Sequence, residues 1–159
     1  MAAPASASPR VRVAALIQAD GKVVLVRHKA GDHRYHLLPG GGVDFGETLE
    51  DALVREVHEE TGLLVEIGHP LFLSDTIDPS GRRHVVNITF SATRVGGEVT
   101  DSPADARIEA VDLVSPESLA QLDLRPPMAE SLVRALRGEV VSAEYLGSLF
   151  APAKRGPTV

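Results

Sequence analysis

The densest group of potential metal ligands in this sequence is a set of carboxylates near the middle of the chain. Glu56, Glu59 and Glu60 are three and four residues apart, so on a helix their side chains share one face. Carboxylates this close repel one another unless a cation lies between them, and oxygen ligands of this kind favour Mg²⁺ or Mn²⁺. The same spacing also suits an acidic face in solvent, and the carboxylates alone do not decide between the two.

The residues around the carboxylates favour the metal site. Arg55 can orient neighbouring carboxylates through bidentate hydrogen bonds, although an ordinary surface ion pair is the alternative. Gly40, Gly41 and Gly42 let the backbone pass close to a ligand, and a carbonyl exposed there could be a further metal ligand. A plain turn is the alternative for these glycines.

A helix from about Leu49 to Glu60 is expected to carry the carboxylates. Thr48 and Asp51 have the spacing of a capping box, which is typical of a helix start. Gly62 can end the helix in the left-handed conformation. Four apolar residues at helical spacing should face a core: Leu49, Ala52, Leu53 and Val57.

Strand patterns on both sides of this helix predict an α/β fold with a mixed sheet. The Asp20-Gly21 pair predicts a hairpin turn between the first two strands, and residues 28–34 are expected to be a polar loop. Asp78 to Gly81 is typical of a β-turn. The expected strands are 11–18, 22–27, 35–38, 63–67, 71–74, 85–95 and 106–114, and the later helices are 116–122, capped by Ser115, and 127–136.

The length of 159 residues and the ordinary globular composition predict one domain. We expect a disordered lead-in over residues 1–9, the domain over 10–138 and a C-terminal arm over 139–159. The arm has an apolar cluster, Tyr145 to Phe150, which should pack on its own domain or on a partner subunit, and we expect a homodimer. No apolar run is long enough to span a membrane. The absence of cysteine excludes disulfides and fits the cytoplasm, where we expect the protein.

The formal net charge of −6 argues against a partner that is a nucleic-acid polymer, because such partners usually need a basic surface. Small substrates are favoured instead. An acidic protein that binds phosphates must overcome charge repulsion, and a bound cation would do this.

The segment Gly41–Leu63 resembles the Nudix box. That motif requires a glycine, five residues, a glutamate, seven residues, Arg-Glu, an aliphatic residue, any residue, Glu-Glu, any residue, a glycine and an aliphatic residue. All nine defined positions are filled, by Gly41, Glu47, Arg55, Glu56, Val57, Glu59, Glu60, Gly62 and Leu63.

The resemblance implies a Nudix-type α/β/α sandwich and a hydrolase that cuts phosphoanhydride bonds with Mg²⁺ or Mn²⁺. It implies that Glu56, Glu59, Glu60 and the carbonyl of Gly40 hold metal. Glu47 and Arg55 would support these ligands. Glu56 could instead be the base that deprotonates water, since the family does not place its base uniformly.

Members of the family often recruit one more acid from outside the box. Glu98, Asp101, Asp105 and Glu109 lie in a suitable region. We favour Glu109, because the segment around it resembles the late strand of the family. A solvent-facing strand acid is the alternative for each.

The sequence says less about the substrate. Arg27, His28 and Arg34 could bind phosphates, although a solvated loop is the alternative, and Phe45 could stack on a base or belong to the core. Pro79, sixteen residues after the box, resembles a pattern in ADP-ribose-cleaving relatives, but its turn also explains it. ADP-ribose or a related nucleoside diphosphate sugar is the expected substrate. The alternatives are a pyrophosphatase of normal or oxidised nucleoside triphosphates, and a non-catalytic nucleotide sensor.

Overall fold

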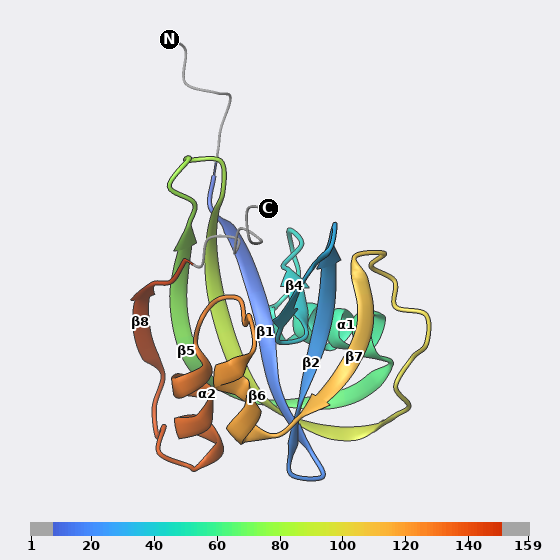
Figure 1. The fold of residues 1–159 in the computed structure, drawn as a ribbon. Helices are drawn as coiled ribbons and strands as arrows, with labels where there is room; N and C mark the ends of the chain where they lie inside the picture. Colours follow the sequence, from blue (N-terminus) through green and yellow to red (C-terminus); the bar gives the residue numbers. More distant parts are fainter. Residues whose placement is uncertain (1–7, 151–159) are drawn as a thin grey trace.

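The computed structural model describes residues 8–150, which form a sheet with helices on both faces (Figure 1). The strands are β1 (Arg10–Ala19), β2 (Lys22–Ala30), β3 (His33–Leu37), β4 (Gly40–Gly42), β5 (Leu63–Ile77), β6 (His84–Gly97), β7 (Ile108–Val114) and β8 (Glu144–Ser148). The helices are α1 (Leu49–Thr61), the 3₁₀ helix η1 (Pro116–Gln121) and α2 (Ala129–Leu136).

The sheet is mixed, as predicted. Its main order is β3-β2-β1-β6-β5-β8, with β4 paired to β1 and β7 paired to β2. The pairs β1/β6 and β5/β8 are parallel, and the others are antiparallel. β1 and β2 pair only beside their shared turn, at Gln18 with Val23 and Ala19 with Lys22. Beyond that point the two strands separate, and this opens one end of the sheet (Figure 1).

Each face of the sheet has its own hydrophobic core. Alternate residues of β1 point to opposite faces, as the two-residue period of a strand requires. Val13 and Ile17 therefore pack with Leu53 of α1, whereas Leu16 packs with Leu132 of α2. The two helices cover opposite faces, which confirms the predicted sandwich.

The ends of α1 confirm the predicted helix to within one residue. The side chain of Thr48 accepts a hydrogen bond from the backbone N–H of Asp51, and its φ and ψ are extended, as an N-cap requires. Gly62 ends the helix with φ of 78°. A Cβ there would also collide with the carbonyl of Glu98, so glycine is required on two counts.

Two sequence-based assignments were wrong, and a third was right only in part. Residues 28–34 are not a loop, because β2 continues to Ala30 and β3 begins at His33. The strands expected at 63–67 and 71–74 are one irregular strand, β5, whose register with β6 shifts around Pro70. Ser115 is the N-cap residue of η1, as predicted, but its side chain makes no hydrogen bond to the helix backbone; its hydroxyl lies 2.8 Å from the hydroxyl of Ser118.

The described part of the C-terminal arm packs on its own domain. β8 adds a parallel strand beside β5, and Leu146 and Leu149 pack against the α2-side core. Arg134 of α2 also makes a bidentate ion pair with Glu144. The homodimer and the cytoplasmic location stay predictions.

Two further expectations concern the ends of the chain and membrane spans. Most of the predicted lead-in over 1–9 and the last part of the arm, 151–159, lie outside the described residues. Within residues 8–150 no helix is long and apolar enough to cross a membrane.

Both cores should contribute to stability. Leu53→Ala and Leu132→Ala should each lower the free energy of unfolding by about 2–5 kcal/mol, since each truncates a fully buried side chain. Val54→Ala, on the exposed side of α1, is the matched control and should change it by about 0.5 kcal/mol or less. Denaturant titration followed by circular dichroism measures all three. A change under about 1 kcal/mol for Leu132→Ala would contradict the second core.

Candidate active site

A cleft of about 550 Å³ lies at the open end of the sheet, where β1 and β2 separate. The glycines of β4 form part of its wall, and α1 contributes Glu56 and Glu60. β4 is held against β1, with Gly40 opposite Ala14 and Gly42 opposite Arg12. The predicted glycine triplet and two of the three predicted carboxylates therefore meet at one cleft.

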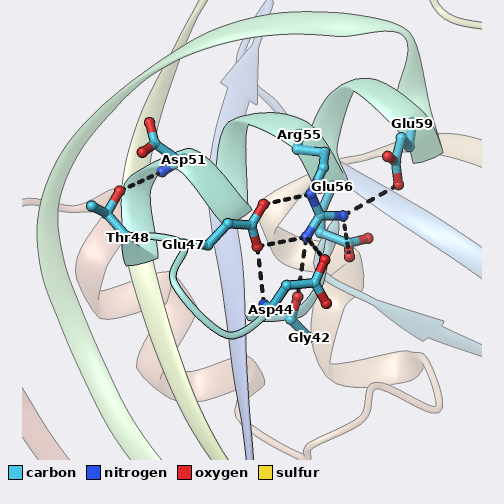
Figure 2. A network of polar contacts seen from close by, with 8 residues as sticks. All are labelled: Gly42, Asp44, Glu47, Thr48, Asp51, Arg55, Glu56 and Glu59. Atoms are coloured by element: carbon cyan, nitrogen blue, oxygen red, sulfur yellow. Dashed lines mark hydrogen bonds and ion pairs between the residues drawn. The ribbon is translucent and has the colours of Figure 1, made fainter.

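Arg55 connects the acids of the box into one network (Figure 2). Its Nε and Nη2 donate to the two carboxylate oxygens of Glu47 at 2.7 and 2.9 Å. Its Nη1 donates to Glu56 at 2.9 Å and, at a longer 3.5 Å, to Glu59. Nη2 also donates to the carbonyl oxygen of Gly42 at 3.3 Å. One guanidinium thus links the helix carboxylates to the glycine strand.

The charges of Glu47 and Arg55 are fixed at neutral pH. The hydrogen bonds from Arg55, and one from the backbone N–H of Asp44, lower the pKa of Glu47 to about 2. Hydrogen bonds to Glu47 and Glu56 raise the pKa of Arg55 above its already high usual value. Glu47 therefore neutralises Arg55 and holds it in place, in the supporting role predicted for both residues.

The glycines let the carboxylates approach the backbone. A Cβ on Gly41 would collide with the carboxylate of Glu56, and a Cβ on Gly40 would collide with the carbonyl oxygen of Val13. The N–H of Gly40 donates to Glu60 at 3.0 Å. Close approach, rather than a turn, explains why these two positions need glycine.

Glu60 is the buried acid of the cleft, with 6% of its surface exposed. Burial raises the pKa of Glu60 to about 7, while the N–H of Gly40 and the charge of Arg12 act in the opposite direction. A buried carboxylate with so little compensation is costly. The oxygen donors of Glu60, Glu56 and the Gly40 carbonyl fit a hard divalent cation, which would supply that compensation.

Glu59 lies outside the set of described residues that line the cleft. Its side chain is 45% exposed and touches the network only through the longer contact with Arg55. The cleft therefore brings together Gly40, Glu56 and Glu60, and places Glu59 at its margin.

Glu109, the favoured acid from outside the box, points elsewhere. Arg34 holds it with two hydrogen bonds of 2.6 and 2.7 Å, and Nε of Arg27 lies 3.2 Å from it. None of these three residues is among those of 8–150 that line the cleft. Of the four acids considered from outside the box, the one that does line it is Asp105. This geometry argues against the catalytic prediction for Glu109 and the phosphate-binding predictions for Arg27 and Arg34.

Of the predicted substrate-binding residues His28 and Phe45, only His28 lies at the cleft. His28 lines the cleft and is 5% exposed, and burial lowers its pKa despite the nearby charge of Asp105. Phe45 is fully exposed on the loop before α1, and it is not part of the cleft wall within the described range. The stacking role predicted for Phe45 therefore has no support from its position.

The arginines that line the cleft were not predicted from the sequence. Among residues 8–150 five of them do so: Arg10, Arg12, Arg83, Arg107 and Arg125. A signal existed for two of them, because Arg10 and Arg12 continue the alternation of Ala14 and Leu16 toward the α2 face. Charged residues at inward positions of a strand usually serve a ligand or a buried partner.

Arg125 forms a second fixed group at the cleft. Its guanidinium lies 4.2 Å from the centroid of the Tyr35 ring, and Nη2 donates to Asp123 at 2.9 Å. His33 is within 2.6 Å of the same Asp123 carboxylate. These contacts hold Arg125 in place, so little side-chain entropy is lost when it binds an anion.

Comparisons with known proteins agree with this architecture. Residues 8–135 match the family model described as NUDIX domain. The chain is 36% identical over 113 residues to a protein of Methanocaldococcus jannaschii named ADP-ribose pyrophosphatase, covering 70% of this chain and 67% of that one. It is 27% identical to phosphatase NudJ of Escherichia coli K12, over 93% of this chain and 97% of the relative. A NUDIX hydrolase structure from Nitrosomonas europaea has a TM-score of 0.73 at 25% identity, covering 85% and 93% of the two chains.

Metal binding should depend on the planar guanidinium of Arg55, which contacts both oxygens of Glu47, as well as on its charge. Arg55→Lys keeps the charge but loses the bidentate contact with Glu47, so Mn²⁺ affinity should fall about 10- to 100-fold. Arg134→Lys breaks a similar bidentate pair remote from the cleft and serves as the matched control. Mn²⁺ titration by electron paramagnetic resonance, on variants whose folding is checked by circular dichroism, measures both. Equal affinities for the two variants would contradict the organising role of Arg55.

Proposed function

Because this chain belongs to the Nudix hydrolase family and is a hydrolase of pyrophosphate bonds, we propose that it uses Mg²⁺ or Mn²⁺ to cleave the diphosphate of ADP-ribose or a related nucleoside diphosphate sugar. The observation that carries the proposal is the meeting of Glu56, Glu60 and Gly40 at a cleft whose wall is rich in arginine. Carboxylates opposite cations are what a phosphoanhydride substrate and its metal ions require together.

The proposed metal ligands are Glu56, Glu59, Glu60 and the carbonyl oxygen of Gly40. A bound divalent ion neutralises phosphate oxygens and makes water a better nucleophile. Glu47 and Arg55 take no direct part in ligation; they hold Glu56 and the glycine strand in position. In an alternative arrangement Glu59, Glu60 and Gly40 hold the metal, while Glu56 accepts the proton of the attacking water.

The arginines are proposed to bind the diphosphate. Nη2 of Arg12 donates to the carbonyl oxygen of Leu38 at 2.9 Å, and Arg125 is held by Asp123. Both guanidinium groups are thus positioned before substrate arrives. Fixed cations of this kind stabilise charge that develops on the bridging oxygen as the bond breaks.

Two substrate classes remain in competition. The 36% identical relative is named ADP-ribose pyrophosphatase, which supports the nucleoside diphosphate sugar. The five arginines of the cleft also suit the denser charge of a nucleoside triphosphate, so this is the second candidate.

Product analysis by chromatography separates these classes. The purified protein is offered ADP-ribose, other nucleoside diphosphate sugars, and normal and 8-oxo nucleoside triphosphates with Mg²⁺. We expect AMP and ribose 5-phosphate from ADP-ribose. Glu60→Gln should lower kcat by about 100-fold or more, because it removes the buried charge of the cleft. Glu66→Gln, an exposed acid on β5, should leave kcat unchanged.

The other results also have defined meanings. A monophosphate and pyrophosphate released only from triphosphates would transfer the protein to the second class. Equal rates with Mg²⁺ and with chelator would contradict the proposed metal dependence.

A further inference from the structure

His28 is a buried polar side chain that the proposed mechanism does not use. Within residues 8–150 neither of its ring nitrogens has a hydrogen-bond partner, although only 5% of the residue is exposed. Other histidines here have carboxylate partners: His33 with Asp123, His36 with Asp112 and His84 with Asp75. Because buried polar atoms nearly always find a partner, His28 calls for a ligand.

The backbone explains how His28 reaches the cleft. The pairing of β2 with β7 is irregular here, with Arg27 opposite Ala110 and His28 opposite Ile108, so the extra residue of the bulge lies in β7. β2 itself therefore keeps its regular alternation through His28. His28 continues the alternation of Val24, which packs in the α1-side core. Its ring therefore lies on the α1 face, the same side as Glu60.

Two acids face His28 from other elements. One ligand atom each from His28, Glu60 and Asp105 lies within 4.8 Å of the others. Asp105 sits in the loop before β7, and this loop is anchored to the end of α1 by hydrogen bonds from the N–H groups of Thr100 and Ala104 to the carbonyls of Thr61 and Glu59. The three donors are thus held by β2, α1 and a fastened loop.

Asp105 keeps room for one more partner. The backbone N–H and the guanidinium of Arg107 donate to its two oxygens at 2.7–3.2 Å. Three N–H groups make these four contacts, because Nε of Arg107 is shared between the two oxygens. A carboxylate has about four acceptor sites, so three donors leave about one. Arg107 is 72% exposed, and it orients the carboxylate without enclosing it.

We propose that His28, Glu60 and Asp105 form a cation subsite with a nitrogen donor, which takes a first-row transition ion in preference to Mg²⁺. Imidazole is a good ligand for transition ions, whereas Mg²⁺ prefers an all-oxygen shell. The neighbouring oxygen donors, Glu56 and the Gly40 carbonyl, lack this nitrogen and suit Mg²⁺. The subsite rests on the proposed function only in sharing Glu60 with it.

Pulsed electron paramagnetic resonance of bound Mn²⁺ tests the subsite without any turnover. Electron spin echo modulation detects a directly coordinated imidazole through its ¹⁴N nucleus. We expect this modulation in the unmodified protein and its loss in His28→Gln, together with an at least tenfold weaker Mn²⁺ affinity and a less than about threefold change for Mg²⁺. His36→Gln, which alters a histidine outside the cleft wall as described, is the matched control and should retain the signal.

Asp105→Asn keeps the test decisive if His28→Gln does not fold. It should weaken Mn²⁺ at least tenfold, while the ¹⁴N modulation of the bound fraction persists because His28 is intact. Mn²⁺ binding without ¹⁴N modulation in the unmodified protein, or modulation that persists in His28→Gln, overturns the subsite alone. No Mn²⁺ binding at all overturns both the subsite and the proposed metal-dependent function.

Discussion

The cleft depends on the bidentate contact between Arg55 and Glu47. Carboxylates on one helix face repel one another, and a lone arginine among them would be free to move. Glu47 fixes two of the guanidinium nitrogens, so the third can hold Glu56. Gly41 completes the arrangement, because any side chain there would displace the Glu56 carboxylate. A cluster that would otherwise be destabilising is thereby kept in the geometry a cation requires.

The sheet supplies the opposite wall. β1 and β2 pair only beside their turn, so one end of the sheet opens and β4 fits against β1. At this opening, the arginine side chains of β1 line the cleft, and so do His28 and Asp105. The acidic chain, with its net charge of −6, therefore presents both anions and cations to one cleft. A substrate with metal-bound phosphates is complementary to both kinds of charge.

The sequence predicted the parts of the site that depend on local structure. Spacing on one helix placed Glu56, Glu60 and Arg55 together, and Thr48 and Gly62 defined the ends of that helix. Some residues that long-range pairing brings to the cleft were not predicted. Arg83 reaches the cleft from the turn before β6 and Arg125 from the loop before α2, and no local pattern marks them. Glu109 was preferred to Asp105 because the segment around it resembles the late strand of the family, whereas the pairing of Glu109 with Arg34 is visible only in the folded sheet.

The most direct test of the account is anomalous diffraction from crystals of the protein grown with Mn²⁺. The account predicts a manganese peak within coordination distance of Glu60, Glu56 and the carbonyl oxygen of Gly40, and no such peak in crystals of Glu60→Gln. Manganese found only at acids outside the cleft, or at full strength in the Glu60→Gln crystals, would contradict the central claim that the Arg55-organised carboxylates form the metal centre.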